Sequence, residues 1–155
     1  MAGSTDNVIV IDAPLDFVWH AMNDVERWPE LFTEYASAEI LEREGETVRF
    51  RLTTFPDEEH GGQVWSWVSE RTVDPSTRTS RSHRIETGPF EYMRIDWSFA
   101  PADAGTEMRW RQRFAMKPEA PVDDAGAEVY LNRNTRTQMQ VIKERLEAQV
   151  RAATM

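Results

Sequence analysis

The sequence predicts an α+β fold in which a curved antiparallel sheet of seven strands wraps round one long C-terminal helix. Two observations carry this prediction. Six strand-like segments, separated by turn residues, follow one another between Tyr35 and Met116, and an earlier alternating segment adds a seventh strand. Residues 122 to about 152 contain no proline and a single glycine, with apolar side chains at helical spacing.

The N-terminal part of the chain predicts one strand and two short helices. Residues Thr5–Ile11 alternate in hydropathy and are rich in β-branched side chains, which predicts the first strand. Asp12 is expected to cap a helix that begins near Pro14. A second helical segment is expected over Val25–Leu31, with Pro29 inside it as a break.

Turn signals then divide the middle of the chain into strands. They lie at Gly45, in residues 56–62, at Asp74-Pro75, at Gly88-Pro89 and in residues 101–105. Pro118 and Pro121 end the sheet, and the helix that follows is roughly 45 Å long at about 1.5 Å per residue. A curved sheet wrapped round one helix leaves a ligand cavity where the facing side chains do not fill the space.

Composition places the chain in one class and excludes others. Its 155 residues, 40% of them hydrophobic, suit a single domain over residues 1–155 with one core. The formal net charge of -9 argues against broad binding to nucleic acid or to anionic membranes, which require excess positive charge. The absence of cysteine excludes disulfides and thiolate chemistry. With a short polar start and no long apolar run, the protein is expected to be cytoplasmic.

One predicted strand carries an unusual set of side chains on a single face. Trp65, Trp67, Ser69 and Arg71 are spaced two apart, so a strand places all four on the same side. Such a face is typical of the wall of a deep apolar pocket with a charge at its end. A buried arginine needs an anionic or hydrogen-bonding partner, which an oxygen-rich ligand supplies. The alternative is that Arg71 reaches solvent or pairs with a carboxylate in the core.

The last two predicted strands each have one apolar and one basic face. The apolar faces carry Met93, Ile95, Trp97 and Phe99, and then Met108, Trp110, Gln112 and Phe114. The opposite faces carry Arg94, Arg109, Arg111 and Arg113, with Arg81 and His83 beside them. We favour a solvated exterior stripe, paired with Glu91, Asp96 and Glu107, over a docking patch for an acidic protein.

Candidates for metal or cofactor chemistry are weak. Asp57, Glu58, Glu59 and His60 are of metal-ligand type but lie consecutively on one turn without a second cluster, so no metal is expected. The chain has no glycine-rich phosphate loop and no serine in a nucleophile-elbow pattern. The sequence therefore predicts a protein that works without a cofactor.

Several blocks, in order along nearly the whole chain, resemble one family. They are Trp28-Pro29-Glu30-Leu31-Phe32, Glu34-Tyr35-Ala36, residues 64–71, residues 83–93, residues 105–110, Leu131-Asn132 and Thr135-Arg136. They resemble the single-domain aromatase/cyclases of bacterial type II polyketide synthesis, close to the tetracenomycin and spore-pigment members. The resemblance implies a helix-grip fold of the START and Bet v1-like kind. It also implies aldol closure of a first ring, between carbons 9 and 14, and dehydration of an unreduced poly-β-ketone on an acyl carrier protein.

The residues and the resemblance together suggest roles in such a site. Arg71, Ser69 and Tyr35 are the expected catalytic residues, with Arg71 stabilising enolate and aldolate oxygens and Tyr35 donating a proton at dehydration. The expected substrate-binding residues are Trp28, Phe32, Trp65, Trp67, Arg84, Phe90, Met93, Trp97, Trp110, Thr135 and Gln138. Alternatively, Thr135 and Gln138 are ordinary polar residues on the surface of the helix. Trp110 is alternatively a packing residue of the core. The general base is not assigned. His83 is a candidate by residue type, but it is adjacent to Arg84 on a strand, so if Arg84 faces the pocket His83 faces outward.

Two functions of different classes stay open. The first is the aromatase/cyclase, whose partners are an acyl carrier protein bearing the linear chain and a type II ketosynthase/chain-length factor complex. The second is a non-catalytic binding protein or polyketide chaperone of the same fold. The polar set Arg71, Ser69, Tyr35 and Arg84 in an otherwise aromatic pocket favours the enzyme, because a lipid carrier needs few such groups.

Overall fold

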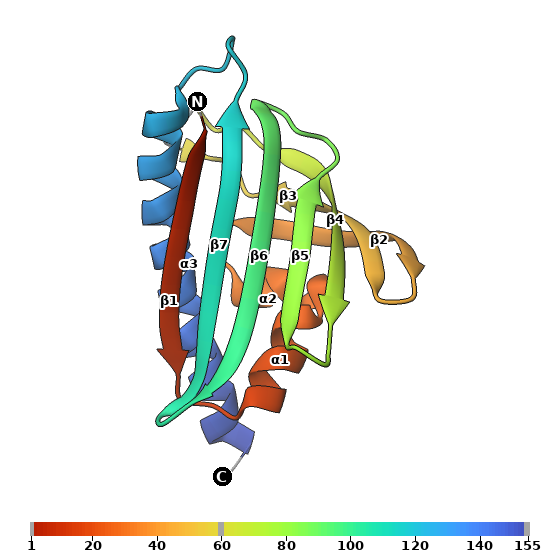
Figure 1. Ribbon diagram of the computed structural model, residues 1–155, viewed down its shortest axis with the longest axis vertical. Helices are drawn as coiled ribbons and strands as arrows, with labels where there is room; N and C mark the ends of the chain where they lie inside the picture. Colours follow the sequence, from red (N-terminus) through yellow and green to blue (C-terminus); the bar gives the residue numbers. More distant parts are fainter. Residues whose placement is uncertain (1, 59–60, 154–155) are drawn as a thin grey trace.

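The computed structural model describes residues 2–58 and 61–153, and its strands form one seven-stranded antiparallel sheet (Figure 1). The strands are β1 Gly3–Ile11, β2 Tyr35–Glu44, β3 Thr47–Thr54, β4 Ser66–Asp74, β5 Thr79–Arg84, β6 Phe90–Ala102 and β7 Gly105–Met116. Their order is β1-β7-β6-β5-β4-β3-β2, so every neighbouring pair except β1 and β7 is also consecutive in sequence. The predicted fold class and strand count are confirmed.

The sheet curls strongly from one edge to the other. In Figure 1, β2 and β3 run across the direction of β1 and β7, as expected from the cumulative twist of neighbouring strands. Register shifts between Tyr35 and Ser37 and between Ile40 and Glu42 add to the bend in β2. The long helix α3 (Asp124–Ala153) packs against β1 and β7 on the far side of the sheet in this view.

Two short helices follow β1, as predicted. They are α1 (Leu15–Asn23) and α2 (Trp28–Leu31), joined by a 3-10 turn, η1 (Val25–Arg27). The predicted cap at Asp12 is wrong, because Pro14 occupies the N-cap position and no side chain caps α1. Instead, the backbone N–H of Asp12 donates to the Glu147 carboxylate of α3 at 2.8 Å. Pro29 lies in the first turn of α2, where a helix needs no N–H donor, so it helps to begin this helix.

Two apolar clusters fill the space between the sheet and the helices. The larger joins α1, α2, α3 and the inner face of the sheet, and includes Trp28, Phe50, Trp97 and Ile142. The smaller contains Phe90, Met93, Phe114 and Ala127. Because burial of one large apolar side chain is worth about 1.5–3 kcal/mol, this packing and not helix propensity holds α3 in place. Within the described ranges, no helix is both long and apolar enough to cross a bilayer.

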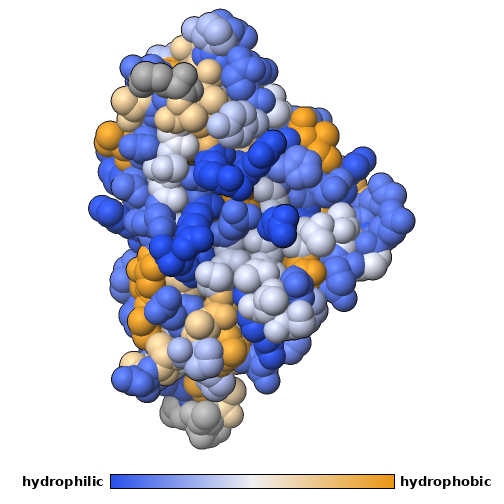
Figure 2. Space-filling view, viewed as in Figure 1, coloured by the Kyte–Doolittle hydropathy of each residue, from blue (hydrophilic) through white to orange (hydrophobic). Residues whose placement is uncertain are grey.

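The outer face of the sheet carries the basic stripe that strand parity predicts. Arg81, His83, Arg94, Arg111 and Arg113 are exposed there, and Figure 2 shows hydrophilic side chains across the middle of this face. Arg109 donates to both carboxylate oxygens of Asp6 on β1, and Arg113 lies 3.6 Å from Asp96. These pairs support the favoured interpretation of a solvated, cross-paired surface, although the pairing with Asp6 was not predicted.

Candidate functional site

Arg71 lies inside the molecule, on the inner face of β4. It is 4% exposed, and its Nη2 donates a 2.6 Å hydrogen bond to Oδ1 of Asn23, the last residue of α1. Its guanidinium carbon lies 5.6 Å from the ring centre of Trp28 and 5.0 Å from that of Trp97. Ser69, two residues earlier on the same face, is also buried. The predicted inward direction is confirmed, and no carboxylate of the described residues forms an ion pair with Arg71.

Burial determines the electrostatics of Arg71. Desolvation lowers its pKa from the ordinary arginine value to about 9, so the guanidinium is still cationic at neutral pH. The two indole faces and one amide oxygen offset part of the cost of burying that charge. A guanidinium has several N–H donors, and an amide oxygen satisfies only part of that capacity. Arg71 is therefore well suited to stabilise a developing oxyanion.

Aromatic rings occupy the interior beside Arg71. Trp97 and Trp110 stack with their ring centres 4.5 Å apart, and Phe32 stacks on Trp110 at 5.9 Å. Trp28 lies 5.5 Å from Trp97 and 5.6 Å from Phe32, measured between ring centres. The expected open cavity is not what these residues form, because the rings contact one another. Dense packing is favoured because a void loses dispersion contacts, so a long ligand requires these rings to move.

A second polar group lies where α2 leads into β2. Glu34 accepts a 3.1 Å hydrogen bond from Nδ2 of Asn134 on α3, and another from the Tyr35 hydroxyl. Arg84, at the end of β5, interacts electrostatically with both Glu34 and Tyr35. Its guanidinium carbon stands 4.2 Å from the ring centre of Trp67. The structure thus brings together the carboxyl of Glu34 from the connection before β2, the phenol of Tyr35 from β2 and the cation of Arg84 from β5.

Burial shifts the pKa of each ionisable member of this group. Desolvation raises the pKa of Glu34 above 4.5, opposed by its hydrogen bonds with Asn134 and Tyr35. Desolvation, followed by the charge of Glu34, raises the pKa of Tyr35 well above 10.0. Desolvation also lowers the pKa of Arg84 from the ordinary arginine value to about 10. A carboxyl with a raised pKa is a stronger base than an ordinary carboxylate, which suits it to take up and return a proton.

Sequence reasoning missed Glu34 and Asn23. In a regular strand, neighbouring side chains point to opposite faces, so Glu34 and Tyr35 are not expected on the same side. Glu34 precedes β2, however, and the β2 register shifts just after Tyr35, which allows both side chains to turn inward. The available signal was a charged residue soon after the apolar pair Leu31-Phe32.

Thr135 and Gln138 are buried on the inner side of α3. Each is 4% exposed, so the alternative of ordinary helix-surface polarity is wrong. The Thr135 hydroxyl donates to Oε1 of Gln112 on β7 at 3.1 Å. The backbone N–H of Thr33 donates to Oε1 of Gln138 at 3.0 Å, and Nε2 of Gln138 donates to the Thr33 hydroxyl at 2.8 Å. These contacts attach α3 to the sheet and to the segment that carries Glu34.

Phe90 and Met93 lie in the smaller apolar cluster, apart from the rings around Arg71. Both are buried, as expected of them. Phe90 still contacts the second polar group, because the guanidinium carbon of Arg84 lies 4.9 Å from its ring centre. The structure therefore places Phe90 beside Arg84, with Met93 in the same apolar cluster as Phe90.

Trp65 does not belong to the buried wall that strand spacing predicted. Pairing between β3 and β4 ends at Ser66, so Trp65 precedes the strand, and it is 37% exposed. Its backbone N–H donates to the Thr54 hydroxyl at 3.0 Å. His83 is exposed on the outer face, which confirms the parity argument.

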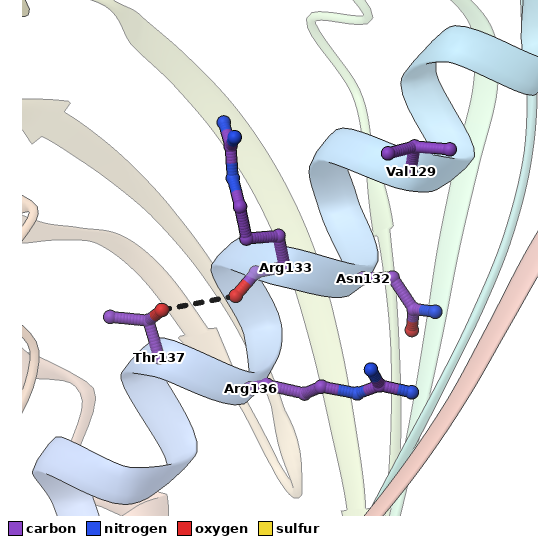
Figure 3. Close-up of a pocket in the computed structure, with 5 residues that line it drawn as sticks. All are labelled: Val129, Asn132, Arg133, Arg136 and Thr137. Carbon is purple, nitrogen blue, oxygen red and sulfur yellow. Dashed lines mark hydrogen bonds between the residues drawn. The ribbon is translucent and has the colours of Figure 1, made fainter.

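An open concavity of about 430 Å³ lies on the exposed side of α3 (Figure 3). Its lining is Val129, Asn132, Arg133, Arg136 and Thr137. All five residues come from one helix, and the expected substrate-binding residues are not among them. Asn132 and Arg136 each hydrogen bond with Asn7, at 2.8 and 2.9 Å, which fastens α3 to β1. We assign this concavity no part in the site.

Across residues 2–58 and 61–153, no group of three or more His, Cys, Asp or Glu side chains is placed to hold a metal ion. Of the acidic turn considered from the sequence, Glu59 and His60 lie outside the described residues. That the protein needs no metal therefore stays a prediction.

Comparisons with known proteins point to one family. Residues 11–143 match the family described as "Polyketide cyclase / dehydrase and lipid transport". The chain is 58% identical over 147 residues to the "Putative polyketide cyclase" of Streptomyces cyaneus, covering 95% of each protein. It is 32% identical over 133 residues to the granaticin polyketide synthase bifunctional cyclase/dehydratase of Streptomyces violaceoruber, covering 84% of this chain and 40% of that protein.

The crystal structure of the Zhui aromatase/cyclase from a Streptomyces species has a similar architecture. It matches with a TM-score of 0.85 at 23% identity, over 99% of this chain and 98% of that one. This likeness confirms the predicted helix-grip fold. The family match covers most of the chain, and the Streptomyces cyaneus relative covers nearly all of it. The chain belongs to the polyketide cyclase / dehydrase and lipid transport family.

Proposed function

We propose that this protein is an aromatase/cyclase that closes the first ring of an unreduced poly-β-ketone, between carbons 9 and 14, and promotes loss of water from that ring. One observation carries the proposal. The buried cation of Arg71 and the carboxyl–phenol pair of Glu34 and Tyr35 are connected by contacting rings, through Trp28 and Phe32. Family membership and the names of the relatives support the same reaction class.

The first step of the proposed reaction is an aldol closure. A methylene between two ketones is acidic, so the difficulty is selecting one carbon and one carbonyl on a flexible chain. The Glu34 carboxylate removes a proton from that methylene and leaves an enolate. The enolate carbon attacks the selected carbonyl carbon, a carbon–carbon bond forms, and the carbonyl π electrons move to oxygen. Arg71 stabilises the resulting alkoxide by charge and hydrogen bonding.

Dehydration uses the same carboxyl–phenol pair. The Tyr35 hydroxyl gives its proton to the alkoxide and recovers one from the protonated Glu34. Glu34 then removes a ring proton next to a carbonyl, a carbon–carbon double bond forms, and the hydroxyl leaves as water with a proton from Tyr35. Proton transfer from Glu34 back to Tyr35 restores both groups, so the net change is loss of one water.

The proposed partners follow from the substrate. An acyl carrier protein presents the linear chain, and a type II ketosynthase/chain-length factor complex in the cytoplasm makes it. Arg84, Ser69, Thr135 and Gln138 supply polar contacts that select the register of the chain, and the expected aromatic residues fold it.

A non-catalytic ligand carrier or polyketide chaperone is the second candidate. The family description includes lipid transport, and the contacting interior rings suit a hydrophobic ligand. Desolvated ionisable groups argue for the enzyme, because a carrier gains nothing from the cost of desolvating Glu34 and Arg71.

Reconstitution with the ketosynthase pair, the carrier protein and malonyl donors tests the proposal. Wild type is expected to enrich products closed between carbons 9 and 14, and Arg71→Ala to give the mixture formed without any cyclase. Arg109→Ala, which changes an exposed arginine on the outer face, is the matched control and should behave as wild type. A folded Arg71→Ala that keeps the wild-type product pattern would refute the catalytic role. Identical products with and without wild-type protein would favour the carrier.

A further inference from the structure

We infer that the indole N–H groups of Trp97 and Trp110 donate hydrogen bonds to carbonyl or enol oxygens of the substrate and thereby fix its position beside Arg71. This inference rests on the proposed function and extends it. The two tryptophans then form an oxygen-binding subsite, in addition to the apolar wall that the sequence predicted.

The observation behind this inference is a pair of buried donors without acceptors. Trp97 and Trp110 are 7% and 5% exposed, and within the described structure Nε1 of each has no hydrogen-bond partner. Buried polar groups are nearly always paired, because leaving one unpaired destabilises the folded chain. Trp28 follows the rule, since its Nε1 donates to the Met22 carbonyl at 3.0 Å.

The two donors lie at matching positions on neighbouring strands. Trp97 of β6 and Trp110 of β7 are register partners, and their rings are nearly parallel, with an interplanar angle of 8°. The guanidinium carbon of Arg71 is 5.0 Å from the ring centre of Trp97. One cation and two N–H groups thus belong to one part of the interior. A chain with a carbonyl at every second carbon offers several acceptors to such a set.

Packing alone does not account for tryptophan at both positions. Phenylalanine buries a large ring without introducing an N–H that needs an acceptor. The neighbouring rings that fill this interior, Phe32, Phe50 and Phe99, do so without a polar atom. Two adjacent indoles with unpaired N–H groups are therefore explained by an acceptor that arrives with a ligand.

Isosteric replacement separates hydrogen bonding from packing. In 3-(3-benzothienyl)alanine a sulfur replaces the indole N–H and the ring size is nearly unchanged, so this residue is introduced at position 97 or 110. The probes are 1-phenylbutane-1,3-dione, which carries two carbonyl oxygens, and butylbenzene, which carries none. We expect affinity for the diketone to fall about three- to tenfold, as for loss of one hydrogen bond, with affinity for butylbenzene unchanged.

At Trp28, whose N–H already has an acceptor within the chain, the same replacement is expected to lower the midpoint of urea unfolding. The matched binding control is Trp19, which is buried and is not among the expected substrate-binding residues. Replacement at position 19 is expected to leave the ratio of the two affinities unchanged. An unchanged ratio at both position 97 and position 110 would overturn the inference. Equal losses for both probes would also overturn it, because they indicate altered packing. So would a wild-type protein that binds the diketone no more tightly than butylbenzene.

Nitrogen-15 labelling of the tryptophans gives an independent readout. Each of the six indole N–H groups has its own signal, assigned by single Trp→Phe variants. We expect the diketone to move the signals of Trp97 and Trp110 downfield, and butylbenzene not to do so. Absence of a diketone-specific shift at both residues would contradict the inference. Because these assays measure binding, they fail or succeed separately from the reconstituted cyclisation, which tests the proposed function itself.

Discussion

The guanidinium carbon of Arg71 on β4 lies 5.0 Å from the ring centre of Trp97 on β6, although β5 runs between these two strands. The residues of β5 at this point are small. Ser82 is the register partner of Arg71, and Ser80, which is buried, is the register partner of Trp97. Two short side chains therefore leave room for a long cation and an indole to meet above the intervening strand.

Replacing Arg71 is expected to separate stability from function. Arg71→Met removes a buried charge that has one amide partner and keeps a long apolar side chain. Because no carboxylate of the described residues pairs with Arg71, the replacement leaves no unpaired countercharge in the interior, and we expect an equal or higher free energy of unfolding. The variant should no longer select which carbons form the first ring in the reconstituted reaction. Urea unfolding and product analysis measure the two effects.

The same variant should show a distinct pH dependence. Below a pH of about 9, Arg71 is charged in both the folded and unfolded chain, and the full cost of its burial is present. As pH rises above about 9 the unfolded chain binds more protons than the folded chain, so the stability of wild type rises with pH relative to Arg71→Met.

Arg109→Met, at an exposed pair with Asp6, should lose at most about 1 kcal/mol and keep the wild-type products. A large loss of stability in Arg71→Met would contradict the argument.

Glu34→Gln is expected to stabilise the protein increasingly as pH rises above 4.5. Burial raises the pKa of Glu34, so above 4.5 the folded chain keeps a proton that the unfolded chain has lost. The stability of wild type therefore falls as pH rises through the folded pKa, whereas a neutral amide avoids this loss. Urea unfolding at several pH values from about 4 to about 8 measures the difference.

Glu147→Gln is the control with the opposite sign. The hydrogen bond from Lys143, with that from the Asp12 backbone N–H, lowers the pKa of Glu147 below 4.5. Its stabilising contribution is present above 4.5 and disappears as pH falls through the folded pKa. The Gln variant should thus be weakest, relative to wild type, at neutral pH. Parallel curves for Glu34→Gln and wild type would show that the Glu34 carboxyl is not held in a desolvated site.

Local rules predicted the parts of the site that lie on regular strands. A period of two was enough to place Arg71 and Ser69 inside and His83 outside, because the strands that carry them are regular there. The same rule failed for Trp65, because the length of a strand depends on where its partner stops pairing. Glu34 was missed because it precedes a strand with shifted register. Contact among the interior rings depends on packing in three dimensions, which no local pattern encodes.

Tyr35→Phe is expected to raise the pKa of Glu34 further and to slow dehydration. The Tyr35 hydroxyl hydrogen bonds with Glu34 and lowers its pKa, so removing the hydroxyl removes that effect. Carboxyl carbon NMR follows the titration of Glu34 directly. Loss of a positioned acid typically costs about 10²-fold or more, so the undehydrated ring should accumulate in the reconstituted reaction. Tyr92→Phe, an exposed tyrosine on β6, should change neither quantity. An unshifted Glu34 titration in Tyr35→Phe would exclude the coupling.

Gly105→Ala is expected to be among the most destabilising single substitutions in this chain. Gly105 begins β7 with a φ of +130, and an added Cβ would lie 2.2 Å from the Ile11 carbonyl oxygen and 2.9 Å from the Ala13 nitrogen. Both atoms belong to backbone, which cannot move aside as the end of a flexible side chain does. Strain and overlap together should cost at least about 3 kcal/mol, measured by urea unfolding.

Gly45→Ala separates backbone strain from overlap at Gly105. Gly45 also has a positive φ, +58, but an added Cβ there would have nothing within 4 Å. Its substitution should cost only about 1–2 kcal/mol, the usual penalty for a left-handed residue. Gly105 packs against the segment that leads into α1, and the last residue of α1, Asn23, accepts a hydrogen bond from Arg71. The folded fraction of Gly105→Ala should therefore also select less strictly which carbons form the first ring. Equal costs for the two substitutions would show that β7 approaches the end of β1 less closely than these distances require.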